Sequence, residues 1–485
     1  MRLAGSALLC VAAVTVLALA AGDAALAQRV FSRGPAASVS VPPRGGYHGG
    51  YSGGGGRGYI GGYFGPRLMG VPPVVMQSYE GGDIVDDGPG PRRARRAPSG
   101  APAANERRLV PDEVVVEIAN SVSAQQIEAL QRRHRLTRLE TQTFQLSGTT
   151  LMRWRIPDRR SVGSVVRALQ AERVVTSVQP NYLFTLQGEG QAVTEGDPAQ
   201  YELAKLHLPQ AHAMAKGDNV PVAVIDSGVD AQHPELAGAV SQSYDALSSP
   251  FSPHKHGTAI AGLIAAHGKL MGAAPAAHLL AIRAFDGSGA SAEGTTFNIL
   301  KGLDWATANG ARVINMSFAG PSDPAIHRSL AAAHKKGIVL VAAAGNAGPQ
   351  SPPLYPAADP NVIAVTATDA DDKLFAQANR GRYVALAAPG AQILVAIPDD
   401  KYEVSSGTSY SAAEVSGIVA LILERQPNLS PDRVRDILLA TAKDLGPKGR
   451  DTMFGAGLAD AYGALMAEPA PVAAAPLEHV STGAR

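Results

Sequence analysis

Cysteine is nearly absent from the chain, since Cys10 is the only one among 485 residues. A disulfide needs two thiols, so a small fold held together by crosslinks is excluded. Stability has to come from a packed core and from any bound ions. Cys10 also lies in an N-terminal segment that we expect to be removed. The mature protein therefore has no thiol for catalysis or for metal binding.

Aromatic side chains are sparse, and the chain has no large excess of charge of one sign. The formal net charge is +1, and Phe, Trp and Tyr make up 5% of the residues. A nearly neutral chain carries no global signal for binding nucleic acid, so we expect no nucleic-acid partner. The length is enough for two or three domains with a large core.

Long hydrophobic runs are scarce, and the one near the N-terminus, Leu8–Ala20, is short. Arg2 precedes it and Ala25-Leu26-Ala27 follows it, which is the pattern of a secretory signal peptide over residues 1–27. A retained membrane anchor is the alternative, but the run is short for a bilayer. We expect a secreted or periplasmic protein with no stable membrane span after signal removal.

Two segments are low in complexity. Residues 28–106 are rich in Gly, Pro and Tyr, and residues 469–485 are rich in Ala and Pro. Such segments bury too little apolar surface to offset the entropy lost on ordering, so we expect a disordered spacer and a loose tail. The basic run Arg92–Arg96 fits a processing site, a contact with an anionic surface, or a solvated run, and we favour the last.

Residues 107–187 change to a compact alternating pattern. The expected order is strand, helix, strand, strand, helix, strand, which is typical of a ferredoxin-like fold. That fold hosts many functions, so it indicates none by itself. The expected helices are Ser123–His134 and Ser161–Glu172, and the strands are Val114–Ile118, Thr137–Leu146, Thr150–Ile156, Val174–Val178 and Tyr182–Leu186.

After a linker at 188–199, residues 200–468 alternate strands rich in Val, Ile and Ala with helical segments. Apolar strands with helical crossovers predict a parallel sheet covered on both faces, an α/β domain in three layers. The expected helices include Glu293–Asn309 and Pro324–Lys336, and the strands are Val220–Ile225, His278–Phe285, Val313–Ser317, Ile338–Ala343, Val362–Thr366 and Tyr383–Ala387.

The stretch Gly407–Leu423 organises this domain. Gly407 is expected to permit a tight turn, and the small residues after it predict a closely packed helix. Ser409 then lies at the helix N-terminus, where free N–H groups and the helix dipole favour an oxygen that becomes negative. A lone Ser at this position is more often a helix cap than a nucleophile. The presence or absence of catalytic partner residues therefore distinguishes the two roles.

Three candidate partners lie beside glycines at the ends of elements. Asp226 follows the first strand of the domain, His256 begins a small-residue helix, and Asn346 follows a buried strand. Each alone is more often a turn former or a structural residue. Together they supply a base for the Ser409 hydroxyl, a carboxylate that holds the imidazole tautomer, and an amide that stabilises an oxyanion beside the Ser409 N–H.

These motifs resemble the subtilisin-like serine proteases, or subtilases, over most of residues 200–466. The resemblance extends to His233–Leu236, Asp286–Gly289, Val313–Gly320, Tyr355–Ala357 and Ala388–Gly390. It implies a serine endopeptidase with catalytic Asp226, His256 and Ser409 and oxyanion donor Asn346, acting on peptide or protein substrates without a cofactor in the chemistry. The implied substrate-binding residues are Gly287, Ser288, Gly289, Ser317, Phe318, Ala319, Ala342, Ala343, Ala344, Gly345 and Leu354.

The resemblance also gives residues 107–187 a role. In subtilases a domain of this shape, placed directly before the catalytic domain, is a propeptide that inhibits the enzyme and assists its folding. Its last strand occupies the cleft. The resemblance thus implies an autoinhibited zymogen, with its own propeptide as a partner in cis and self-cleavage between about Leu186 and Tyr201. A plain accessory binding domain is the alternative.

The chain departs from the subtilase pattern at three places. Ala259 stands where the family has His, and Ala413-Glu414 stands where it has Pro-His. A Glu buried beside the nucleophile must be paired or protonated, and the sequence identifies no partner. The loop Ala265–Gly272 is shorter than the family's calcium-binding loop and lacks its Asn and Asp oxygens, so we expect no metal there and leave calcium elsewhere undecided.

The leading hypothesis is a secreted serine endopeptidase with a preference for uncharged side chains before the scissile bond. A peptide-binding module that has lost turnover, or is permanently inhibited, is compatible with Ala413 and Glu414. A surface or matrix protein that works through its Gly-rich arm is a third class. Turnover that survives deletion of residues 31–105 would exclude this third class.

Overall fold

The computed structural model describes residues 100–103, 105–119, 121–187, 200–247, 249–287 and 292–467. The expected signal peptide, linker and C-terminal tail, and nearly all of the expected spacer, lie outside these residues. Of the helices in the described part, none combines the length and the hydropathy needed to cross a bilayer.

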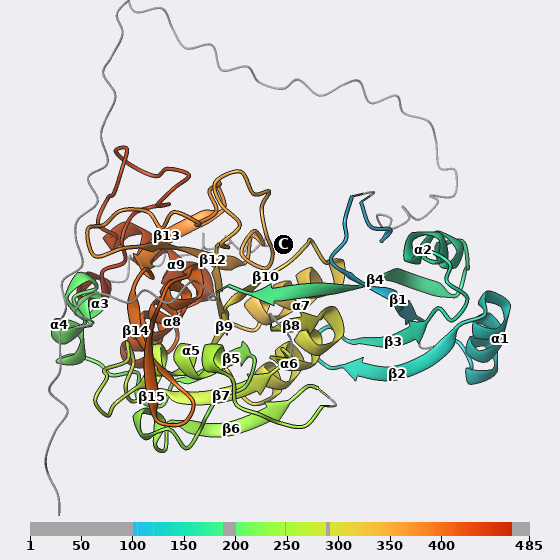
Figure 1. Cartoon of the computed structure of the whole chain (residues 1–485), viewed down its shortest axis with the longest axis horizontal. Coiled ribbons are helices and arrows are strands. Elements are labelled where there is room, and N and C mark those ends of the chain that lie inside the picture. The colour runs from blue at the N-terminus through green and yellow to red at the C-terminus, as the bar shows by residue number, and fades with distance from the viewer. Residues whose placement is uncertain are drawn as a thin grey trace, which may run out of the picture. The chain divides into compact units, whose positions relative to one another are not determined.

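The first folded unit has the predicted βαββαβ order (Figure 1). Its strands form an antiparallel sheet in the order β4-β1-β3-β2. Ser123 and Ser161 are the N-caps of the two helices. Buried Trp154 and Val165 belong to the core between the sheet and the helices. The elements are β1 (Leu109–Ile118), α1 (Ala124–His134), β2 (Thr137–Phe144), β3 (Thr149–Arg155), α2 (Val162–Gln170) and β4 (Val175–Leu186).

The last strand of this unit differs from the prediction. Two strands, Val174–Val178 and Tyr182–Leu186, were expected, but β4 is continuous from Val175 to Leu186. Proline fixes φ near −65°, which extended backbone accepts, and Pro180 stays in register opposite Val114. The result is one long strand that reaches from the first unit into the second.

The second unit is built on a seven-stranded sheet in the order β13-β12-β11-β9-β5-β7-β6. All neighbouring strands in it are parallel, as predicted. Polar Val240–Asp245 was not predicted as a strand, because it has no apolar run. The strands are β5 (Pro221–Asp226), β6 (Val240–Asp245), β7 (His278–Arg283), β9 (Val313–Met316), β11 (Val339–Ala343), β12 (Val362–Thr368) and β13 (Val384–Pro389).

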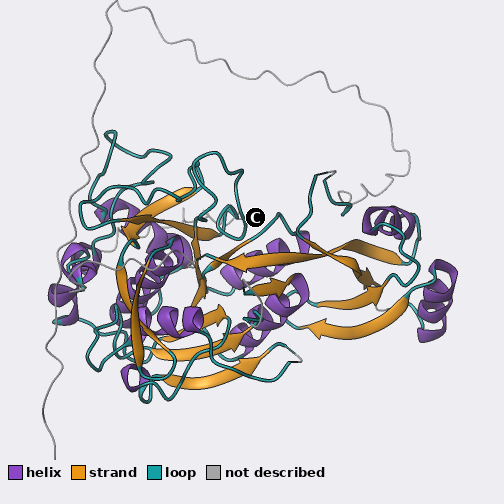
Figure 2. Cartoon of the chain, viewed as in Figure 1, coloured by secondary structure: helices purple, strands orange, loops and turns teal. Residues whose placement is uncertain are grey.

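Helices cover both faces of this sheet (Figure 2). Alternate residues of β5 point to opposite faces: Val222 and Val224 belong to one buried cluster, and Ala223 and Ile225 belong to the other. The helices and the short turn of 3-10 helix η1 are α3 (Tyr201–Lys205), α4 (Leu208–His212), η1 (Pro234–Leu236), α5 (Lys255–Ala265), α6 (Thr296–Ala308), α7 (Pro324–Lys335), α8 (Thr408–Arg425), α9 (Pro431–Thr441) and α10 (Ala461–Met466).

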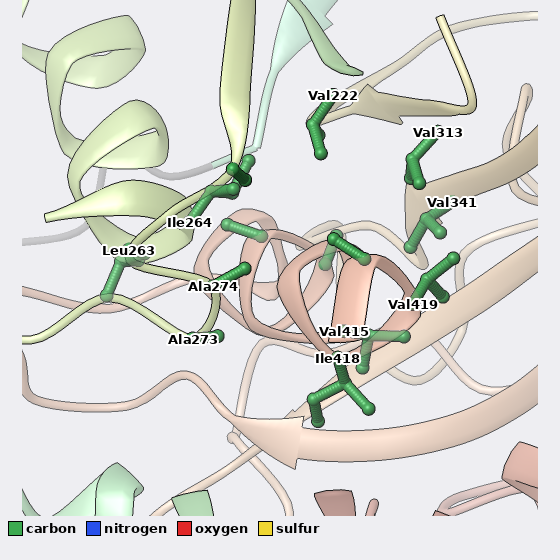
Figure 3. Packing of buried hydrophobic residues seen from close by; sticks show 14 of the residues in the cluster. Val222, Leu263, Ile264, Ala273, Ala274, Val313, Val341, Val415, Ile418 and Val419 are labelled. Atoms are coloured by element: carbon green, nitrogen blue, oxygen red, sulfur yellow. The ribbon is translucent and has the colours of Figure 1, made fainter. Parts of the chain in front are cut away.

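Helix α8 lies in the first of these clusters. Val415, Ile418 and Val419 on α8 belong to the same buried cluster as Val222 and Val341 of the sheet. Val419 lies toward Val341, and Ile418 points to the opposite side of the helix (Figure 3). Sixteen consecutive residues of α8, from Thr408 to Leu423, are buried. The helix that carries Ser409 is therefore fixed by packing along nearly its whole length. The remaining strands are short: β8 (Glu293–Thr295), β10 (Phe318–Ala319), and the hairpin of β14 (Ile393–Ile397) and β15 (Lys401–Ser405).

Candidate active site

Asp226 and His256 are held in direct contact. Asp226 ends β5 and His256 is the second residue of α5, so the carboxyl end of a parallel strand meets the start of a helix. Nδ1 of His256 lies 2.9 Å from Oδ1 and 3.0 Å from Oδ2 of Asp226, and both side chains are buried. The carboxylate thus holds the imidazole through Nδ1 and leaves Nε2 as the nitrogen that can exchange a proton.

Ser409 is the second residue of α8, and Gly407 is the N-cap. The φ of Gly407 is 163°, which is extended backbone open to any residue, so the conformational need for glycine expected there is not found. The Ser409 hydroxyl donates to the carbonyl oxygen of Ser317 at 3.0 Å. Nε2 of His256 has no hydrogen-bond partner among the described residues. The two predicted proton-transfer partners are therefore not hydrogen-bonded to each other in this state.

Asn346 is oriented by a residue that the sequence argument missed. Its Oδ1 accepts hydrogen bonds from the backbone N–H of Thr408 at 3.1 Å and from the Thr408 hydroxyl at 2.8 Å. Because the amide oxygen is occupied in this way, the NH₂ group is the end that can donate to a ligand. The signal in the sequence was the hydroxyl directly before Ser409.

Gln187 occupies the centre of the site. Its carbonyl oxygen accepts a hydrogen bond from the backbone N–H of Ser409 at 3.1 Å, and its own N–H donates to the carbonyl of Ser317 at 3.0 Å. Its side-chain Oε1 accepts from the backbone N–H of Asn346 at 2.8 Å. Sequence reasoning did not single out Gln187, because nothing in its local sequence marks it.

The strand before Gln187 is bound on both edges by the second unit. Leu186 and Thr185 pair antiparallel with Phe318 and Ala319 of β10. Thr185, Phe184 and Leu183 pair antiparallel with Glu293–Thr295 of β8. Chain 183–187 thus lies as a central strand between two edges of the second unit, which is how an extended peptide is bound by strand addition.

Phe184 fills an aromatic pocket three residues before Gln187. The ring is fully buried and meets Phe318 edge to face at 6.1 Å between centroids. A Cβ placed on Gly320 would lie 2.2 Å from Cδ1 of Phe184, so the ring uses the space that a side chain would take. Gly320 was not among the predicted substrate-binding residues.

Some of the other predicted substrate-binding residues lie at or just after the end of β11, and some lie elsewhere or outside the described residues. Ala342 and Ala343 end β11, and Ala344 and Gly345 follow. Gly345 has φ 112°, and a Cβ on it would lie 3.1 Å from Cδ1 of Leu354. Gly287 lies against the ring of His254. Ser288 and Gly289 lie outside the described residues.

Strand β4 also caps the N-termini of two helices. The side-chain amide of Gln179 donates to Asp323 at 2.9 Å and accepts from the N–H of Ala325, at the start of α7. Oδ1 of Asn181 accepts from the N–H of Phe297 at the start of α6. Free N–H groups at helix N-termini need acceptors, so these contacts join the two units through obligatory hydrogen bonds.

The loop after α5 is held by a carboxylate. Glu235 accepts hydrogen bonds from the N–H groups of Gly268, Lys269 and Leu270 at 2.9 to 3.1 Å, and from the hydroxyl of Tyr402 at 2.6 Å. Burial raises the pKa of Glu235, but these hydrogen bonds outweigh it, so the net pKa lies below the usual 4.5.

In the described part of the chain, no three His, Cys, Asp or Glu side chains gather in an arrangement that could hold a metal ion.

Glu414 has a second carboxyl as its neighbour. Glu414 on α8 and Glu202 on α3 are each 1% exposed. Oε2 of Glu414 and both side-chain oxygens of Glu202 have no hydrogen-bond partner among the described residues. Burial, and then the charge of Glu202, raise the pKa of Glu414 well above 4.5, and burial raises the pKa of Glu202 to about 7. The raised pKa favours the protonated form of Glu414, and its neighbour Glu202 is a second acid that cannot form an ion pair with it.

Comparison with known proteins agrees with this architecture. Residues 217–457 match the subtilase family model. The chain is 35% identical over 284 residues to thermitase from Thermoactinomyces vulgaris, an alignment that covers 56% of this chain and 99% of thermitase. It is 39% identical over 241 residues to subtilisin DY from Bacillus licheniformis, covering 48% of this chain and 86% of that protein.

A solved structure is similar as well. Fervidolysin from Fervidobacterium pennivorans, described as a keratinolytic enzyme related to subtilisin, superposes with a TM-score of 0.64 at 25% sequence identity. The match covers 74% of this chain and 62% of fervidolysin, so somewhat less than two thirds of that protein has a counterpart here. With the parallel sheet and the sequence matches, these findings show that the chain belongs to the subtilase family, the subtilisin-like serine proteases.

Proposed function

We propose that the chain is an exported serine endopeptidase made as an autoinhibited zymogen, with Asp226, His256 and Ser409 as its catalytic triad. The observation that carries this proposal is the hydrogen bond from the N–H of Ser409 to the carbonyl oxygen of Gln187. Residues 183–187 lie between β8 and β10, and the last carbonyl of this strand accepts a hydrogen bond from the N–H of Ser409. This is the geometry expected of a bound substrate. Residues 107–187 are then the propeptide, and Gln187 precedes the bond that is cut.

The chemistry follows from the positions of the side chains. The Ser409 hydroxyl leaves Ser317, and His256 Nε2 takes its proton while Oγ bonds to the substrate carbonyl carbon. The carbonyl oxygen becomes an oxyanion that accepts from the Ser409 N–H and the Asn346 amide. The imidazolium, held by Asp226, gives the proton to the leaving amine as the C–N bond breaks. Water then repeats the two steps on the acyl-enzyme and releases the acid.

The same strand supports a proposal for the substrate subsites. Gln187 occupies the position before the scissile bond, and its side-chain oxygen meets the N–H of Asn346. Phe184, three residues earlier, occupies a pocket that includes Phe318 and Gly320. We infer a preference for an uncharged residue before the scissile bond and an aromatic residue three positions upstream.

Intact-mass analysis of the exported protein beside its Ser409→Ala variant tests the proposal. The wild type should be cut after Gln187, giving a chain that begins at Gly188 or is trimmed from there, while the variant keeps residues 107–187 attached. If both proteins are folded and both remain whole, self-processing is wrong. A first cut elsewhere in 188–199 would displace Gln187 from the position before the scissile bond.

A peptide-binding module without turnover is the second candidate. It is favoured by the Ser409 hydroxyl, which donates to Ser317 and not to His256. A fluorophosphonate probe separates the candidates, because it labels only an activated serine. Labelling of the processed wild type at Ser409 supports the protease, and a folded, processed protein that resists labelling supports the binding module.

A further inference from the structure

A second imidazole is connected to the carboxylate of Asp226. His254 is the N-cap of α5, and its Nδ1 accepts the backbone N–H of His256 at 3.3 Å. The same Nδ1 lies 2.9 Å from the hydroxyl oxygen of Ser227. A Cβ on Gly287 would lie 2.5 Å from Cδ2 of His254, so the ring is packed closely against the backbone.

Ser227 links this imidazole to the proposed catalytic residues. Its hydroxyl donates to Oδ1 of Asp226 at 2.9 Å, and its N–H donates to the same oxygen at 2.7 Å. The hydroxyl oxygen also accepts from the N–H of Gly257 at 3.3 Å. His254 and His256 therefore share one carboxylate, and His254 reaches it through a single hydroxyl.

The hydrogen bonds define two states of His254. In the neutral ring, Nδ1 accepts the N–H of His256 and competes with Asp226 for the single hydroxyl hydrogen of Ser227, so Nε2 carries the proton. In the protonated ring, Nδ1–H donates to the Ser227 oxygen and the hydroxyl hydrogen goes entirely to Asp226. The cation then draws electron density from the carboxylate on which His256 depends, and it repels a positive charge on His256.

We propose that His254 is a positioning residue whose protonation, passed on through Ser227 and Asp226, lowers the basicity of His256. The inference rests on the proposed function, because it concerns the base of that reaction. It extends the active site by a residue outside the triad and makes the pH dependence of the base a property of two coupled histidines.

Other charged groups lie near His254, and they keep their charge where histidines titrate. Arg283 lies beside Gly228 and pairs with Asp245 at 2.9 Å, and Lys255 lies 3.7 Å from Glu403. Asp286 directly precedes Gly287, which is packed on the ring. Guanidinium, ammonium and ordinary carboxyl groups do not change charge between about pH 5 and 8, so these neighbours contribute a constant field to the network.

The test uses the full chain with Ser409→Ala, so that self-cleavage and turnover play no part. Nitrogen NMR of labelled histidines follows the titration of His256 with and without His254→Asn, which keeps an oxygen for the cap of α5. The pKa of His256 should rise by about half a unit or more when the neighbouring cation is removed. His207→Asn, at the half-exposed N-cap of α4, is the matched control and should leave the pKa of His256 unchanged.

A second variant tests whether the effect of His254 passes through Ser227. Ser227→Ala removes the hydroxyl link, so a further His254→Asn change in that background should shift His256 by clearly less than it does when Ser227 is present. An unchanged His256 pKa in His254→Asn overturns the proposal, and so does a shift of the same size without Ser227. In the processed enzyme with Ser409 intact, the acid limb of kcat/KM should move to higher pH in His254→Asn. If the wild type shows no turnover at all, the proposed function is wrong. The NMR titration of His256 still tests the proposed role of His254 in that case.

Discussion

The carbonyl oxygen of Gln187 lies 3.1 Å from the backbone nitrogen of Ser409. Gln187, at the end of residues 107–187, is therefore hydrogen-bonded to the proposed nucleophile. Gln187 and Ser409 are 222 residues apart in the sequence, and no local pattern connects them. The contact ties the proposed propeptide to the proposed chemistry through one hydrogen bond, and the predictions below start from it.

Asn346→Ala should lower kcat of the processed enzyme by about 10²–10³ with little change in KM, because the amide acts on the oxyanion and not on the bound substrate. This magnitude comes from measurements on a subtilisin and so is a family value. Steady-state kinetics on a chromogenic peptide checks it. Thr408→Val is the companion variant, since it removes the hydroxyl that orients Asn346 at 2.8 Å but keeps the shape of the side chain. A loss confined to KM in Asn346→Ala would contradict the assigned role.

Gly320→Ala should weaken the binding of chains with a large side chain at the position of Phe184. The added methyl group would lie 2.2 Å from that ring, so the ring or the strand has to move. In the processed enzyme, KM for a peptide with Phe at that position should rise about tenfold or more, whereas a peptide with Ala there should be little affected. Equal losses on both peptides would show a general distortion of β10 and not a filled pocket.

Glu414→Gln should stabilise the fold at alkaline pH. A carboxyl whose pKa is raised on folding binds more protons in the native state, so its presence costs stability as pH rises from the unfolded value of 4.5. For Glu202, with a folded pKa of about 7, the penalty develops between pH 4.5 and 7 and is complete above that, at roughly 3 kcal/mol.

The measurement is the melting temperature of Ser409→Ala and of Ser409→Ala, Glu414→Gln at pH 4.5 and pH 8. The gain from Glu414→Gln should be small at pH 4.5 and several degrees at pH 8. Asp399→Asn, at a residue whose side chain is 80% exposed, is the control and should show no such difference. An equal gain at both pH values would mean that charge burial at Glu414 is not the cause.

Glu235→Gln should destabilise the loop 265–272 at neutral pH by about 2–4 kcal/mol, because several charge-assisted hydrogen bonds weaken together. The folded pKa of Glu235 is lowered, so the stabilisation is present above 4.5 and is lost as pH falls through the folded value. Thermal unfolding of the Ser409→Ala pair with and without Glu235→Gln should therefore show a gap at pH 7 that closes on acidification. A gap that persists at pH 3 would assign the loss to packing.

The sequence alone determined the architecture of both units. The apolar strands with helical crossovers predicted the parallel sheet, and the alternating pattern of 107–187 predicted the βαββαβ unit, because hydrophobic periodicity is a local property that each element carries. It also predicted which residues could supply the chemistry. Asp226, His256 and Ser409, each within two residues of a glycine at an element end, can be identified without coordinates.

Only the tertiary structure determined which residues from different elements are in contact. Gln187 on Ser409, Glu202 beside Glu414, and the link from His254 through Ser227 to Asp226 join residues from different elements, and their energetics depend on burial and distance. Two strands were expected at 174–178 and 182–186, but β4 is continuous, and the local sequence does not show that it pairs with β1 and, at Leu183–Thr185, with β8. Long-range packing fixes these relationships, and no pattern within a single segment can specify them.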